Sequence, residues 1–314
     1  MKRFIKNIFL FLLIGFPFYF VFIIIFGSIP FVKLPNLSYG LGGGSSHSYS
    51  RLKEAKELKN VDILFLGSSH AYRGFDVRIF KEYGFKTFNL GTSSQTPIQT
   101  KLLLDRYLNN LNPKLAVYAI NLNSSDGVES AIDILSNDKK DFSAFLMTLK
   151  INNIKVYNTF IYGIIRDFFN IDKNYYQPLS IKNAYETDNY ISGGYVEKKT
   201  GTLLNIKTKI KIKSTEKTSN TKSVPEYQLK AFSDIINTFL NRDINYLLLL
   251  TPVTDNRYNN YVELLRQYEP YSDFNEILDL DDSYFYDANH LKQEGAEIFS
   301  SSVAELIISK GYIY

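Results

Sequence analysis

The sequence predicts an α/β protein: a three-layer α/β/α sandwich with a mainly parallel sheet, preceded by one N-terminal transmembrane helix. Two observations predict it. Short apolar runs that end in small or polar residues alternate with longer segments of helical periodicity. A long uncharged apolar run also stands near the N-terminus. With 45% hydrophobic and 22% charged residues, the composition is that of a globular protein and excludes a disordered or fibrous chain.

The apolar run extends from Ile8 to Phe26. As a helix it would rise about 28 Å, close to the hydrocarbon thickness of about 30 Å. Lys2, Arg3 and Lys6 precede it, so the positive-inside rule places residues 1–7 in the cytoplasm and the rest of the chain on the outer side. A cleaved signal peptide is the alternative. We favour an anchor over residues 8–26, because the run is longer than a typical signal-peptide core and no small-x-small cleavage site follows.

Residues 27–60 are predicted to form a stalk and a lead-in helix. The first part is rich in glycine and serine, contains His47, and is typical of a flexible linker. Arg51 to Asn60 has a helical composition, so folding is expected to begin near Arg51.

Residues 61–314 are predicted to form one α/β domain. The expected strands are Val61–Gly67, Thr87–Leu90, Leu115–Leu122, Tyr246–Leu250 and Glu276–Leu280. The expected helices are Pro97–Asn110, Glu226–Leu240, Tyr258–Tyr268 and Leu291–Lys310.

The alternation of strands and helices breaks at about residues 127–225, which indicates an insertion. Ile206–Lys213 has a period-two pattern with lysines on one face. That face would suit an anionic glycan or lipid headgroups, but charged edge strands commonly serve only to prevent aggregation, and we favour that interpretation. The insertion also holds aromatic residues that we assign to the core rather than to a sugar-stacking surface: Phe160, Tyr162, Phe168, Tyr175 and Tyr176.

Charge and motif content exclude several functional classes. The net charge is +4, and three of the four excess positive charges precede the apolar run, so no nucleic-acid partner is expected. The chain has no cysteine, which excludes disulfides, thiol nucleophiles and cysteine-ligated zinc. Asp279, Asp281 and Asp282 have no accompanying histidine, and the sequence holds no Walker or Gly-x-Gly-x-x-Gly motif. We therefore predict neither a metal site nor a cofactor.

A serine and a histidine at two strand ends suggest nucleophilic catalysis. Ser69 follows the first expected strand, at the sheet edge where open α/β sheets place ligands. A serine hydroxyl needs an imidazole to take its proton, and the imidazole needs an acceptor to hold its other nitrogen. Of the three histidines, His290 is the best base, with Asp287 three residues before it. His70 adjoins the serine, so we expect it to line the substrate pocket rather than act as the base.

These motifs resemble those of the SGNH/GDSL hydrolase superfamily, in particular its membrane-anchored surface acyltransferase and esterase members. The resemblance rests on Gly67-Ser68-Ser69, on Gly91 in Asn89-Leu90-Gly91-Thr92-Ser93-Ser94, and on Asp287-x-x-His290-Leu291. It covers roughly Asp62–Leu122 and Leu240 to the end. It implies a flavodoxin-like sheet with Ser69 as nucleophile, His290 as base and Asp287 as its orienting acid. Ser68 is a departure, because the commonest members have Asp there.

The resemblance also implies an oxyanion hole. Its first two donors would be the backbone amides of Ser69 and Gly91, although Gly91 is equally compatible with a simple turn glycine. The third is an asparagine side chain. The family's Gly-x-Asn-Asp block is not present. Asn123 is our choice for this donor and Asn121 the reserve, with the alternative that neither supplies it.

We therefore expect a membrane-anchored, extracytoplasmic serine esterase or O-acyltransferase. It is expected to act on the acyl groups of a cell-envelope polysaccharide, and we expect these groups to be acetyl. The expected partners are this acylated polysaccharide or another small ester, the membrane, and a membrane acyl-transfer protein. The alternative is an inactive module of the same fold that binds glycan or assists such a partner.

Overall fold

The computed structural model describes residues 1–27, 36–39, 47–120, 126–170, 188–198, 224–254, 265 and 267–313. Its centre is a parallel sheet of β1 (Ile63–Gly67), β2 (Thr87–Asn89), β3 (Leu115–Ala119), β6 (Asn245–Leu250) and β7 (Tyr271–Asp273). The strand order is β2-β1-β3-β6-β7, and every neighbouring pair is parallel. The prediction of an α/β protein with a mainly parallel sheet is confirmed.

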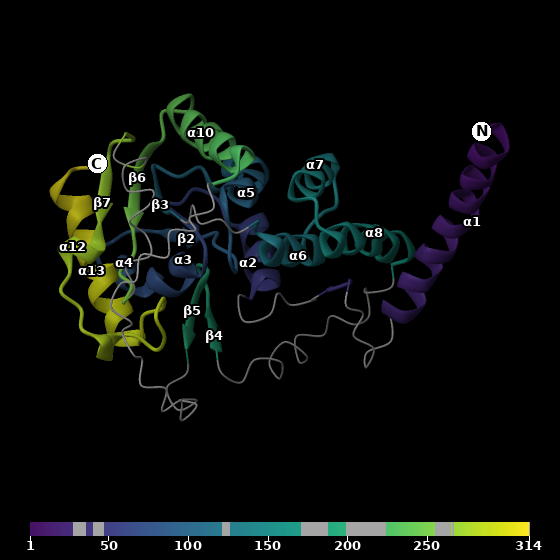
Figure 1. The fold of residues 1–314 in the computed structure, drawn as a ribbon. Coiled ribbons are helices and arrows are strands. Elements are labelled where there is room, and N and C mark those ends of the chain that lie inside the picture. Colours follow the sequence, from purple (N-terminus) through teal and green to yellow (C-terminus); the bar gives the residue numbers. More distant parts are fainter. Residues whose placement is uncertain are drawn as a thin grey trace, which may run out of the picture.

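Helices cover both faces of the sheet (Figure 1). One face is covered by α2 (Ser48–Glu57), α5 (Pro97–Leu111), α6 (Val128–Asn137) and α10 (Glu226–Leu240). The other is covered by α3 (Ser69–Gly74), α4 (Val77–Glu82), α12 (Phe274–Ile277) and α13 (Gln293–Ser309). The strands alternate between the two cores: in β1, Leu64 and Leu66 face the first, and Ile63 and Phe65 the second.

The region predicted as an insertion contains two further units. A helical arm, defined here as α7 (Phe142–Ile151) and α8 (Ile154–Phe169), extends from the body toward α1 (Lys2–Gly27) (Figure 1). A hairpin of β4 (Asp188–Ile191) and β5 (Tyr195–Lys198) packs against α3. The arm therefore lies between the sheet and the N-terminal helix, and the hairpin lies beside the helix that begins with Ser69.

Helix α1 is long and apolar enough to cross a membrane. It includes Pro17, and nearly all of its side chains are exposed. Its Tyr19 exchanges hydrogen bonds with Asn158 of α8, at 2.7 and 3.0 Å between the hydroxyl oxygen and the two amide atoms.

Three sequence predictions are wrong. The strand expected at Glu276–Leu280 lies earlier, as β7, because the Asp273 side chain accepts from the Asn275 amide and starts α12 there. The sequence places His47 in a flexible stalk, but this residue is only 5% exposed. The sequence also predicts that Phe168 lies in the core, but it is 78% exposed, whereas Phe160 and Tyr162 are buried as expected.

Other predictions lie wholly or largely outside the described residues: Ile206–Lys213, Tyr175, Tyr176, and most of Tyr258–Tyr268. The expected helices at Pro97–Asn110, Glu226–Leu240 and Leu291–Lys310 correspond to α5, α10 and α13.

Candidate active site

Ser69 is placed by a sharp turn between β1 and α3. Gly67, the last residue of β1, has φ +137°, and a side chain there would also collide with the carbonyl oxygen of Ala119. Ser68 is extended, and Ser69 begins α3. The Ser69 hydroxyl thus lies just beyond the carboxyl end of β1, at the edge of the sheet where open α/β proteins bind their ligands.

His290 lies within hydrogen-bond reach of Ser69. Its Nε2 is 2.7 Å from Ser69 Oγ, although 221 residues separate the two in the chain. The loop that carries His290 is closed by an isolated bridge between Phe285 and Leu291 and by a hydrogen bond from the Tyr286 amide to the His290 carbonyl oxygen. The distance meets the requirement for a serine and its base.

Asp287 holds the opposite nitrogen of the same ring. Both of its carboxylate oxygens lie 2.9 Å from His290 Nδ1, and Oδ1 also accepts from the backbone amides of Asn289 and His290 at 2.8 and 2.9 Å. Burial opposes ionisation of this carboxyl, but the hydrogen bonds from His290 and the amides outweigh it and lower the pKa of Asp287. An ionised Asp287 selects the tautomer with a proton on Nδ1, which leaves Nε2 as the acceptor for the serine proton.

Tyr286 stacks on His290 and was not found by sequence reasoning. The two rings are 5.3 Å apart at an interplanar angle of 7°. The cations of Arg73 and Lys198 lie over the Tyr286 ring at 5.9 and 4.4 Å. In the sequence, the only indication of a role for Tyr286 is that it directly precedes Asp287. This indication is weak, because the chain has 24 tyrosines.

His70 lies at the edge of the site. Its ring centroid is 5.5 Å from that of His290, and its Nδ1 is 2.8 Å from Thr251 Oγ1 at the end of β6. Burial, and then the neighbouring His290, lower the pKa of His70 to about 3. His70 is therefore neutral at physiological pH. Its ring lies beside that of His290, and its contact with a substrate stays a prediction.

Gly91 lies against the loop that carries the serine. A Cβ at this position would be 2.9 Å from the carbonyl oxygen of Gly67 and 3.0 Å from that of Ser68, so only glycine allows this approach. The Gly91 amide, however, donates to Asn89 Oδ1 at 3.0 Å. Gly91 thus lies beside the serine loop as expected. Its backbone amide, the expected oxyanion donor, is already hydrogen-bonded to Asn89. Asn121 and Asn123 lie outside the described residues.

Asp281, in the chain segment before His290, has a structural role. Asp281 caps the short helix Asp282–Tyr284 by accepting from the Ser283 amide at 2.7 Å. In the described part of the chain, no group of three or more His, Cys, Asp or Glu side chains is arranged to hold a metal ion.

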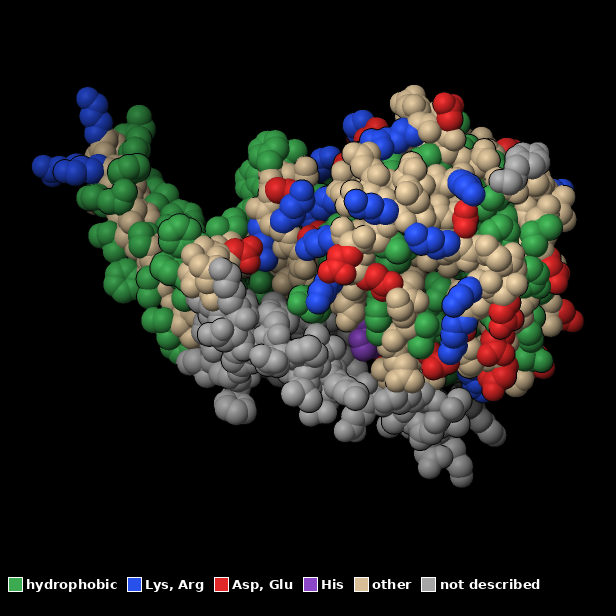
Figure 2. Space-filling view, turned by 180° about the vertical axis from the view of Figure 1, so that it is seen from behind, with side chains coloured by type: hydrophobic (Ala, Val, Ile, Leu, Met, Phe, Trp, Pro, Cys, Tyr) green, Lys and Arg blue, Asp and Glu red, His purple; other side chains and the backbone are tan. Residues whose placement is uncertain are grey.

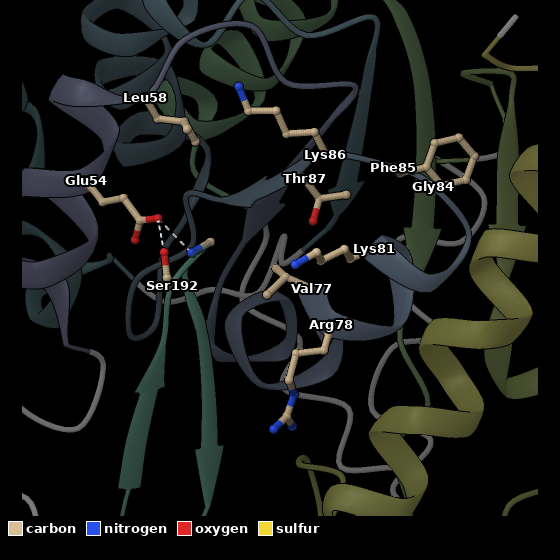
Figure 3. A pocket seen from close by; sticks show the side chains of 11 residues that line it. Glu54, Leu58, Val77, Arg78, Lys81, Gly84, Phe85, Lys86, Thr87 and Ser192 are labelled. Atoms are coloured by element: carbon tan, nitrogen blue, oxygen red, sulfur yellow. Dashed lines mark hydrogen bonds between the residues drawn. The ribbon is translucent and has the colours of Figure 1, made fainter.

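A separate cavity of about 480 Å³ lies beside the edge strand β2 (Figure 3). It is lined by residues that include Glu54, Arg78 and Lys81, and by none of Ser69, His290 and Asp287. Within its lining, the Glu54 carboxylate accepts hydrogen bonds from Ser192 Oγ at 2.7 Å and from the backbone amide of Gly193 at 2.8 Å. This cavity is not part of the serine site.

Comparison with known proteins adds no assignment: the chain matches no protein-family model and no curated protein sequence.

Proposed function

We propose that this protein is a membrane-anchored serine esterase or O-acyltransferase of the SGNH type, with its sheet in the flavodoxin-like arrangement and its catalytic domain outside the cytoplasm. The single observation that carries the proposal is the continuous hydrogen-bond chain from Ser69 through His290 to Asp287. The parallel strand order and the position of Ser69 at the carboxyl edge of β1 support it as well.

The reaction follows from the roles of these groups. Ser69 Oγ attacks the acyl carbonyl carbon while its proton passes to His290 Nε2, and the resulting imidazolium is stabilised by Asp287. The tetrahedral intermediate collapses when Nε2 returns the proton to the leaving alcohol oxygen, which leaves an acyl ester on Ser69. A second hydroxyl, from water or from a sugar, then attacks this ester with His290 again as base. Water gives hydrolysis, and a sugar hydroxyl gives acyl transfer.

The backbone amide of Ser69 is the first donor that we assign to the oxyanion. It is in the first turn of α3, where backbone amides have no hydrogen-bond partner within the helix. The Gly91 amide can join only when Asn89 Oδ1 releases it. For the substrate we propose the acyl groups, foremost acetyl, of a cell-envelope polysaccharide, with a membrane acyl-transfer protein as partner, because α1 would keep the site next to the membrane surface.

Labelling with a fluorophosphonate tests this chemistry. We expect the full chain in detergent to be labelled at Ser69 and Ser69→Ala to be unlabelled, because only an activated serine reacts with this probe. Ser68→Ala is a matched control and should still be labelled. Equal labelling of the wild type and Ser69→Ala, or no labelling of either, would contradict the proposal.

A non-enzymatic module is the second candidate, and the engaged Gly91 amide favours it. Such a module would bind glycan or a membrane acyl-transfer partner without turnover. It predicts an unlabelled wild type that still binds polysaccharide.

A further inference from the structure

Helix α7 exposes a continuous apolar stripe, formed by Phe142, Phe145, Leu146 and Leu149. These residues follow the i, i+3, i+4, i+7 spacing of one helix face. The opposite face of α7, with Ala144, Met147, Thr148 and Ile151, is buried. The helix is therefore apolar on both sides, and its only charged residue is Lys150.

The exposed stripe is not an isolated feature of the arm. Phe142 is 72% exposed, and its ring lies 6.3 Å from that of Phe145. At the far end of α8, Phe168 and Phe169 are also exposed. In the space-filling view, hydrophobic side chains gather on the arm between the body and α1 (Figure 2). Apolar side chains clustered in this way commonly mark a contact with a membrane or another protein.

The contact between α8 and α1 indicates which of the two covers the stripe. Tyr19 of α1 bonds Asn158 of α8, and Gly27 at the end of α1 lies against the Tyr162 ring. Tyr19 is eight residues before Gly27, which corresponds to about 12 Å along the helix. An arm held at this level of a membrane-spanning helix cannot stand away from the bilayer.

Two exposed lysines of the arm suit a lipid surface. Lys150 and Lys155, both exposed, flank the turn between α7 and α8. Long basic side chains beside an apolar helix face can reach lipid phosphates while that face enters the headgroup region.

We propose that α7 is an interfacial helix whose apolar stripe lies in the outer leaflet of the membrane that holds α1. The body is then attached to the membrane at two places, the spanning helix and the arm. This inference rests on the proposed membrane anchor and does not depend on the chemistry of Ser69.

The absence of tryptophan in the chain allows a direct test. Phe142→Trp introduces one fluorophore into the stripe, and Ile308→Trp, at an exposed position near the end of α13, is the matched control. Each full-length variant would be reconstituted into phosphatidylglycerol and phosphatidylethanolamine vesicles, with and without acyl chains brominated near the headgroup. We expect brominated lipid to remove most of the Phe142→Trp emission and to leave that of Ile308→Trp unchanged.

Equal quenching at the two positions, whether strong or absent, would overturn the proposal. Water-exposed emission from Phe142→Trp would also overturn it and would favour a protein partner. Leu149→Trp, on the same stripe, repeats the measurement if circular dichroism shows that Phe142→Trp is misfolded.

Discussion

At the residue scale, the orientation of His290 is determined from three sides. Asp287 accepts from Nδ1, Ser69 Oγ lies at Nε2, and Tyr286 stacks on the ring. Asp287 is itself held in place, because the backbone amides of Asn289 and His290 both donate to its Oδ1. The imidazole therefore has one tautomer and one direction, which would remove a reorganisation cost from the proposed reaction.

The substitution Asp287→Asn tests this arrangement. An asparagine cannot stabilise the imidazolium, so we expect turnover of an aryl acetate ester to fall by about a hundredfold or more. The melting temperature should change little, because the Asp287 side chain is 45% exposed. Asp281→Asn, which alters a loop carboxylate outside the triad, is the control and should keep its activity. Unchanged turnover in a folded Asp287→Asn variant would remove Asp287 from the mechanism.

At the scale of elements, the β4–β5 hairpin holds α3 and the edge of the sheet. The backbone amide of Asn89 donates to the carbonyl oxygen of Gly193 at 2.7 Å. The guanidinium of the buried Arg51 donates to the carbonyl oxygen of Gly194 at 2.8 Å. Gly194 has φ +90°, and a side chain there would collide with the Asn89 carbonyl oxygen. On α3, Arg73 forms a buried ion pair with Asp188 at 3.1 Å. The hairpin thus supports the helix that begins with Ser69.

Removal of the Asp188 charge should uncouple the hairpin from α3. Asp188→Asn leaves the Arg73 guanidinium buried without its carboxylate, and we expect the free energy of unfolding to fall by about 3 kcal/mol. Glu197→Gln, on the neighbouring strand at the same end of the hairpin, removes a more exposed ion pair with Arg78 and should cost less than about 1 kcal/mol. Chemical denaturation measures both. Equal midpoints for the two variants would show that the hairpin does not stabilise α3 in this way.

At the scale of the whole molecule, buried histidines link stability to pH. His47 lies between α2 and the hairpin, near Arg51, Arg73, Asp188 and Tyr190. Burial, and then Arg51, lower the pKa of His47 to about 4, while Asp188 opposes the shift. The pKa of His70 is about 3. Both histidines therefore stay neutral in the folded protein at pH values where the unfolded chain, with a pKa of about 6.5, binds protons.

We therefore expect stability to fall as the pH falls from about 6.5 toward about 4, by about 1.4 kcal/mol per pH unit for each of the two histidines. Carboxylates such as Asp287, whose pKa values are lowered, add a loss of the same sign only as the pH approaches about 4 and falls below it. Thermal unfolding at about pH 7 and about pH 5 measures the histidine effect. His47→Gln should show a smaller decrease in melting temperature than the wild type; an equal decrease would exclude His47 as a source.

Sequence patterns were informative where local chemistry and periodicity dominate. The buried strands, the long amphipathic helices and the N-terminal apolar helix each follow from the identity of neighbouring residues. The pairing of Ser69 with His290 was also accessible, because parallel strands bring their carboxyl ends to one edge and only three histidines compete for the role.

Features that depend on contacts between distant segments of the chain could not be predicted from the sequence. The burial of His47 depends on the hairpin residues Asp188 and Tyr190, and the exposure of Phe168 depends on how far the arm extends from the sheet. The engagement of the Gly91 amide by Asn89 and the stacking of Tyr286 on His290 depend on side-chain directions at the sheet edge. Residue types and spacing thus establish the α/β class, the apolar helix and the candidate triad. Packing in three dimensions establishes the site's neighbours and the apolar stripe of α7, because burial and side-chain direction arise from partners far away in the chain.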